Sequence, residues 1–137
     1  MLKEILQSSK EDFRIRLGMM NPNHCIHFFD ELMQVMQDER VYNFLHIPVQ
    51  SGSNSVLSAM KRRYSREQFL ELVDKANSEL KDFCLATDII VGFPGETEKD
   101  FEQTIDLLKE TKPDVVNLSR YGIRPNTAAE KLPQIPE

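Results

Sequence analysis

The chain is poor in cysteine, with two in 137 residues, and it has no tryptophan. Cys25 and Cys84 stand far apart, so they lack the close spacing of a zinc site or a redox pair. We expect both to be reduced, partly buried thiols, because structural disulfides are rare inside cells. The sequence therefore predicts no metal site.

Long apolar runs are also missing. No run approaches the roughly 18 residues that span a membrane, and no signal-peptide pattern opens the chain. We therefore expect no membrane partner and a cytoplasmic location.

Positive charge is scarce as well, with 17 Lys+Arg against 22 Asp+Glu and a formal net charge of −5. The chain as a whole thus lacks the basic character of a nucleic-acid-binding protein, although this balance leaves room for a local basic site.

What the sequence does contain is an alternation of strand-like and helix-like stretches. Strands are predicted over 13–19, 41–49, 83–93 and 113–122, and helices over about 24–38 and 65–80. A short helix is predicted around Val56, Leu57 and Met60, and a last helix begins after Thr97. Such alternation predicts an α/β protein with a parallel sheet of about four strands and right-handed crossovers. Four strands are few for a closed barrel, so a piece of a barrel fits the pattern at least as well as a complete small domain.

Several helix starts are marked by capping residues. Asn23 is a candidate N-cap for the first predicted helix, Ser65 with Gln68 forms a capping-box pattern, and Thr97 precedes the last predicted helix. The proline-rich tail over 123–137 is expected to be irregular.

Polar residues and glycines gather where the predicted strands end, which is where parallel α/β proteins bind ligands. Asp88 lies in an otherwise apolar strand and needs a partner, either a ligand hydroxyl or amine, or a neighbouring arginine. Gln50 suits a ribose hydroxyl or a base edge, or is satisfied by backbone. His46 is more readily a packed or hydrogen-bonded histidine than a base. These residues predict a small-molecule site, with no catalytic residue assigned.

Two further features border that site. The corner "GFPGE" contains Gly92 and Pro94, which allow close approach of the backbone and fix its direction. The run "KRR" includes Arg62 and Arg63; it is either solvated surface or a source of one arginine that binds a carboxylate or phosphate.

The stretches "FLHIPVQSGSNSVLSAMKRRYSREQF" and "ATDIIVGFPGETEKDFEQT" closely resemble the radical S-adenosylmethionine (SAM) domain of tRNA methylthiotransferases. "RIRLGMMNP" and "VYNFLHIPVQSGS" are most similar to the archaeal and eukaryotic branch, which adds a 2-methylthio group to threonylcarbamoyl-adenosine next to the anticodon. The resemblance implies the C-terminal half of a partial TIM-like (β/α)6 barrel, with residues 1–137 carrying its strands three to six. It also implies a parent enzyme that uses SAM and 4Fe-4S clusters and acts on tRNA.

The resemblance carries site residues over by position. Asp88 matches a residue that hydrogen-bonds SAM, Gln50 matches a ribose contact, and Arg62 matches an arginine that meets the methionine carboxylate, with adjacent Arg63 as the competitor. The corner turns close beside the nucleoside. The implied cofactor-binding residues are Gln50, Arg62, Asp88, Gly92, Phe93 and Pro94.

The sequence departs from the family in what it lacks. The cluster motif C-x-x-x-C-x-x-C, the glycine-rich second strand, the N-terminal domain and the C-terminal RNA-binding domain are absent. Clusters need three or four thiolates, so we expect this fragment to bind none and to be inactive alone. Asn126 stands where the family more often has glycine, which matters little because asparagine tolerates left-handed φ.

The first strand would lack a neighbour, so we expect self-association through that sheet edge or cover by residues 1–12. Two other functions stay open. One is a non-enzymatic half-barrel that serves as an interaction module, and the other is a methylthiotransferase of the ribosomal-protein type.

Overall fold

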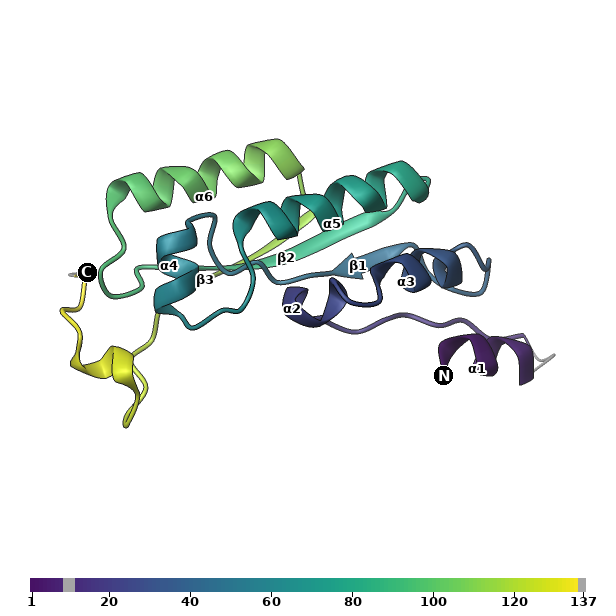
Figure 1. The fold of residues 1–137 in the computed structure, drawn as a ribbon, viewed down its shortest axis with the longest axis horizontal. Helices are drawn as coiled ribbons and strands as arrows, with labels where there is room; N and C mark the ends of the chain where they lie inside the picture. Colours follow the sequence, from purple (N-terminus) through teal and green to yellow (C-terminus); the bar gives the residue numbers. More distant parts are fainter. Residues whose placement is uncertain (9–11, 136–137) are drawn as a thin grey trace.

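Three parallel strands form the centre of the computed structural model, which describes residues 1–8 and 12–135. They are β1 (Phe44–His46), β2 (Cys84–Val91) and β3 (Val115–Arg120), in the order β1-β2-β3. The helices are α1 (Leu2–Ser8), α2 (Pro22–Cys25), α3 (Phe29–Met36), α4 (Asn54–Ala59), α5 (Arg66–Glu79) and α6 (Glu98–Thr111). In Figure 1, α5 and α6 lie along one side of the strands, with α1 and the 3-10 turn η1 (Ala128–Lys131) at opposite ends of the long axis.

The predicted α/β class and parallel sheet are confirmed, but the strand number is wrong. The segment over 13–19 forms only one bridge, between Ile15 and Val41. Its backbone is bonded at Ile15 and again where Met20 N donates to His46 O at 2.9 Å. Between these points Phe44 N donates to Tyr42 O at 2.7 Å in a tight local turn. The turn uses backbone hydrogen-bonding groups that continuous strand pairing with the segment over 13–19 would require. The alternation of side chains was predicted correctly, since Ile15 and its apolar neighbours pack on the core.

The first predicted helix is also wrong as a single element. Residues 26–28 break it into α2 and α3, and the cap is Asn21, whose side chain accepts from Asn23 N. The other starts are confirmed. Ser65 and Gln68 form a capping box, and Thr97 caps α6 in a second box completed by Asp100.

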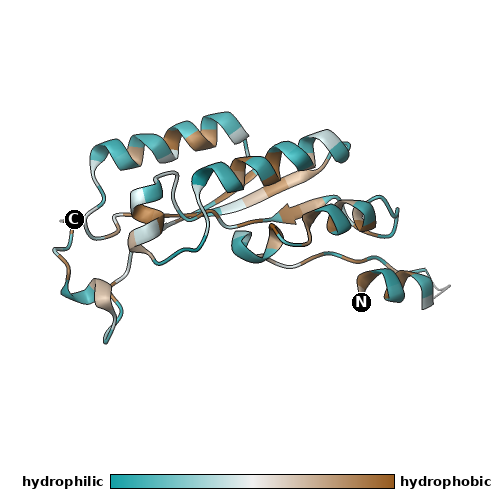
Figure 2. Cartoon of the chain, in the orientation of Figure 1, coloured by the Kyte–Doolittle hydropathy of each residue, from teal (hydrophilic) through white to brown (hydrophobic). Residues whose placement is uncertain are grey.

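One face of the sheet is buried under helices. Leu45, Leu85 and Ile89 point to that face, which is packed by Phe29 and Phe69 from α3 and α5. Figure 2 shows hydrophobic residues along the strands and in separate patches on the largely hydrophilic helices α5 and α6. The opposite face carries the polar residues described below. Both cysteines are free, Cys25 buried and Cys84 half-buried, as predicted.

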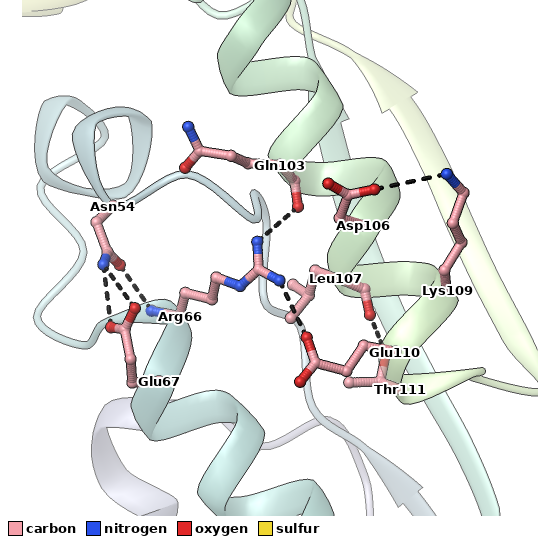
Figure 3. A network of polar contacts seen from close by, with 9 residues as sticks. All are labelled: Asn54, Arg66, Glu67, Gln103, Asp106, Leu107, Lys109, Glu110 and Thr111. Carbon is pink, nitrogen blue, oxygen red and sulfur yellow. Dashed lines mark hydrogen bonds and ion pairs between the residues drawn. The ribbon is translucent and has the colours of Figure 1, made fainter.

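The helix layer is connected by a polar network (Figure 3). Arg66, at the start of α5, donates from its guanidinium to Gln103 O at 2.9 Å and to Glu110 Oε2 at 3.0 Å. Its backbone N–H donates to Asn54 Oδ1 at 2.7 Å. A single residue thereby links the beginning of α4 with two turns of α6. Within the described part of the chain, no helix has the length and apolar character to cross a membrane.

The predicted cover of the sheet edge is only partly described, since residues 9–11 lie outside the described residues. Helix α1 packs on the helix layer: Leu6 is buried, and Lys3 Nζ donates to Gln34 Oε1 of α3 at 3.0 Å. At the other edge of the sheet β3 is exposed, including Leu118 at 66%. Self-association through an edge stays a prediction.

Asp100 ties the loop before α4 to α6. Its Oδ1 accepts from Ser53 Oγ at 2.5 Å and Ser55 Oγ at 2.6 Å, and its Oδ2 accepts from Thr97 Oγ1 at 2.5 Å. These hydrogen bonds, that of Ser53 first, hold the pKa of Asp100 well below its usual range. Gly52 allows the loop to come this close, because a Cβ there would meet Gln103 O at 2.5 Å.

We expect Asp100→Asn to lower the free energy of unfolding by about 1 to 3 kcal/mol, since several hydrogen bonds lose their charged acceptor. The folded pKa is below the unfolded one, so the contribution of Asp100 is complete above about pH 4 and is lost as pH falls further. The gap between wild type and variant should therefore shrink in acid. Urea unfolding across pH measures it.

Asp106→Asn is the matched control. Asp106 is on the same helix, is largely exposed and contacts only Lys109 at 3.5 Å among the described residues. Equal destabilisation by both substitutions would contradict the role given to Asp100.

Candidate functional site

A cavity of about 560 Å³ lies where the strands end, on the face that the helices leave open. Each strand contributes one residue to a row across it: His46 from β1, Asp88 from β2 and Asn117 from β3. The strand register explains this row, because Asp88 pairs with Asn117, and His46 pairs with Ala86, two residues before Asp88 on the same face. The cavity therefore follows from parallel pairing.

Asp88 is the centre of that row. Its Oδ1 lies 2.7 Å from His46 Nε2 and accepts from Asn117 Nδ2 at 2.8 Å. Two donors thus occupy one carboxylate oxygen, which orients the group, and no partner of Oδ2 is recorded among the described residues. His46 is hydrogen-bonded, as predicted. The arrangement leaves Oδ2 available to accept from a hydroxyl or ammonium group in the cavity.

Gln50 enters the cavity wall in a left-handed conformation, with φ of 72°. The backbone is held there from both sides, since Gln50 N donates to Asp88 O at 2.8 Å and Ile90 N donates to Gln50 O at 2.9 Å. Such a conformation costs a residue with a side chain about 1 to 2 kcal/mol. Strain of this kind, maintained by neighbours, is typical of binding sites.

The glycine–proline corner closes one side of the site. Gly92 and Gly95 have φ of 75° and 85°, and Gly92 N donates to Glu96 Oε2 at 2.5 Å. Burial raises the pKa of Glu96, whose Oε1 is buried without a recorded partner. Phe93 lines the cavity, and its ring packs edge-on against that of Tyr121, with the two ring centroids 5.1 Å apart. Gly92 borders a neighbouring cavity of about 480 Å³, and Pro94 is buried.

Arg62 and Arg63 differ in position. Arg62 lines the cavity, and its Nε is buried with no hydrogen-bond partner. Arg63 is exposed and lines a different, smaller cavity. The structure therefore brings Gln50, Arg62, Asp88 and Phe93 together around one space.

Some lining residues were not predicted. Asn117 was not among the predicted site residues. Its polar side chain interrupts an apolar strand and pairs with Asp88, and this interruption is a sequence feature that could have indicated a site residue. Arg124 was placed in the irregular tail, and no local pattern connects it with a strand-end site. With Arg62 and Arg120, it gives the cavity three arginines against one aspartate. This lining suits an anionic group beside a hydrogen-bond donor.

Metal binding is not supported by the arrangement of ligands. The described residues hold no group of three or more His, Cys, Asp or Glu side chains close enough to share an ion. Burial raises the pKa of Cys25 to about 11 and also raises that of Cys84, where Asp114 adds to the effect. Both shifts favour the neutral thiol over the thiolate.

Several known proteins are similar to this chain in sequence or in fold. Residues 1–108 match the family model of the Radical SAM superfamily. The chain is 53% identical over 125 residues to a probable threonylcarbamoyladenosine tRNA methylthiotransferase of Pyrococcus horikoshii, covering 91% of this chain and 29% of that protein. The human threonylcarbamoyladenosine tRNA methylthiotransferase is 40% identical over 136 residues, which cover 99% of this chain and 24% of the human protein. The chain spans less than a third of the length of these curated relatives.

Two solved structures share the fold. Coproporphyrinogen III oxidase (HemN) from Escherichia coli, a radical SAM enzyme, superposes with a TM-score of 0.70 at 21% identity, covering 95% of this chain and 29% of that one. The radical SAM methyltransferase TsrM from Kitasatospora setae superposes with a TM-score of 0.69 at 17% identity, and the match covers 87% of this chain and 24% of that one. At these identities the likeness shows the fold alone, and it confirms the expected TIM-like α/β fold class.

We expect Gln50→Gly to raise the free energy of unfolding by about 0.5 to 1 kcal/mol. Relief of the left-handed strain exceeds the entropy that a glycine adds to the unfolded chain. Asn126→Gly is the control, because Asn126 has a φ of 65° but asparagine tolerates this region. Denaturant unfolding should show a clearly smaller gain for the control; an equal gain would mean that Gln50 is not strained.

Proposed function

Because this chain belongs to the Radical SAM superfamily, we propose that it is part of a threonylcarbamoyladenosine tRNA methylthiotransferase and contributes the SAM-binding strand ends of that enzyme. Relatives of that name, from archaea to human, support the activity. The names favour the tRNA branch over a ribosomal-protein type. The observation that carries the proposal is the cavity shared by Gln50, Arg62, Asp88 and Phe93.

The lining residues fit SAM group by group. Arg62, whose Nε is buried without a partner, suits the methionine carboxylate, since a guanidinium binds carboxylate through two parallel hydrogen bonds. Asp88 Oδ2 suits a ribose hydroxyl, and the Gln50 amide can donate to and accept from the same ribose. Phe93 offers a ring face or edge to adenine. When bound in the parent enzyme, SAM would supply the radical for attack on the adenosine C–H, after its cleavage by an electron from an iron–sulfur cluster of that enzyme.

The same residues do not fit an iron–sulfur cluster. A cluster requires at least three thiolates, and this chain has two cysteines, whose pKa values are both raised. We propose that the clusters of the enzyme are held by residues outside this sequence. The chain by itself is accordingly inactive, and its part is to bind and orient.

The wider assignment follows from the same reasoning. We propose that residues 1–137 correspond to strands three to six of the family barrel, with the segment over 13–19, which forms a single bridge here, in the place of the first of them. The parent enzyme acts on tRNA in the cytoplasm.

We expect SAM to bind this chain weakly, in the millimolar range, and Asp88→Asn and Gln50→Ala to abolish the heat of binding in calorimetry. Arg62→Gln should weaken binding roughly tenfold or more, because a hydrogen-bonded charge pair is lost. Arg63→Gln is the matched control and should leave the affinity unchanged. Absence of binding to wild type at millimolar SAM, or equal losses at both arginines, would contradict the proposed site.

His46 gives a finer test. His46→Leu should weaken SAM binding, because Asp88 Oδ1 loses one of its two donors and the carboxylate is free to turn. His46→Gln keeps an N–H donor at a similar reach and should retain most of the affinity. Circular dichroism checks that both variants fold. Equal loss in both would mean that His46 acts through packing and not through Asp88.

A further inference from the structure

A second cavity, of about 250 Å³, adjoins the first and shares Arg62 with it. Its other lining residues are Asn21, Asn23, His24, Lys61, Arg63 and Tyr64. No carboxylate lines it. The chain has an excess of acidic residues, so a cavity walled only by cationic and neutral groups runs against the average composition.

The cations of this cavity also lack acidic partners. No ion pair is recorded for Lys61, Arg62 or Arg63 in the part of the chain that the structure describes. Elsewhere the pattern is different: Lys75 pairs with Asp30 and Arg66 pairs with Glu110. Three adjacent cations left without carboxylates on an acidic protein produce a local positive potential that attracts anions.

Local structure presents these side chains together. Lys61 follows the C-cap of α4 with a left-handed φ of 57°, and Arg62 N donates to Leu57 O at 2.8 Å. This hydrogen bond closes the last turn of the helix. Behind the run, Tyr64 is buried, and its hydroxyl donates to Val49 O at 3.2 Å. Across the cavity, Asn21 Oδ1 accepts from Asn23 N at 3.0 Å, which leaves the Asn21 amide group able to donate. The site therefore consists of donors held on two sides.

We propose that this second cavity binds a backbone phosphate of RNA, next to the larger cavity in which SAM is proposed to bind. This rests on the proposed function, because the RNA is the tRNA substrate. Phosphate takes parallel hydrogen bonds from arginine and a point charge from lysine, and it accepts from amides as well. Arg62 borders both cavities, so the bound phosphate lies beside the group held by Arg62 in the larger one.

The test measures binding of an anticodon stem-loop RNA to the whole chain by fluorescence anisotropy over a range of salt concentrations. Lys61→Gln and Arg63→Gln each remove one charge from the cavity. We expect each to weaken binding roughly tenfold and to reduce the slope of log affinity against log salt by about 1. Lys81→Gln is the matched control, because Lys81 is exposed and precedes β2, at the opposite end of the sheet. It should change neither quantity.

Several outcomes would overturn the proposal. These are absence of RNA binding to wild type at low salt, an equal effect of Lys81→Gln, or an unchanged salt slope in both cavity variants. Inorganic phosphate is the second probe: if it binds wild type as tightly as the RNA does, the cavity is a free-phosphate site. SAM calorimetry on the same variants separates the two hypotheses, since Arg63→Gln should lose RNA affinity while SAM affinity is kept. Loss of SAM binding alone would count against the proposed function and not against the RNA site.

Discussion

The pairing of β2 on both sides is the constraint on which the rest of the structure depends. β1 and β3 each pair with β2 and not with one another, so the position of every strand-end residue is set relative to this one strand. The parallel register puts Asp88 beside Asn117 and one pleat beyond His46. Since alternate residues face opposite sides, the same register that buries Leu85 and Ile89 under helices turns Asp88 toward the open face.

Around that strand, rigidity is concentrated in the connections. Gln50 is held left-handed by two hydrogen bonds to β2, and the corner after β2 is closed by Glu96 on Gly92 N. The loop before α4 is fixed to α6 through Asp100. All three connections border the larger cavity or support a residue that does. The cavity is thereby shaped mainly by backbone geometry, which suits a site whose part is to orient a ligand.

Charge is distributed unevenly over this frame. The chain is acidic overall, yet the larger cavity has three arginines to one aspartate, and the adjoining one has no carboxylate at all. Arg62, common to both, connects the proposed SAM site with the proposed RNA phosphate site. Local positive charge of this kind suits the two anionic groups proposed here, the methionine carboxylate of SAM and an RNA phosphate, because acidic side chains nearby would repel both groups.

The sequence by itself determined the α/β class, the parallel sheet, the capping boxes at Ser65 and Thr97, and the gathering of Gln50, Asp88 and Phe93 at strand ends. These follow from periodicity and local hydrogen bonding, which act over a few residues. Only the tertiary structure decided that the segment over 13–19 bridges once, that Arg62 and not Arg63 lines the cavity, and that Asn117 and Arg124 join it. Those outcomes depend on strand register and on turns that bring distant residues together, and no local pattern encodes either.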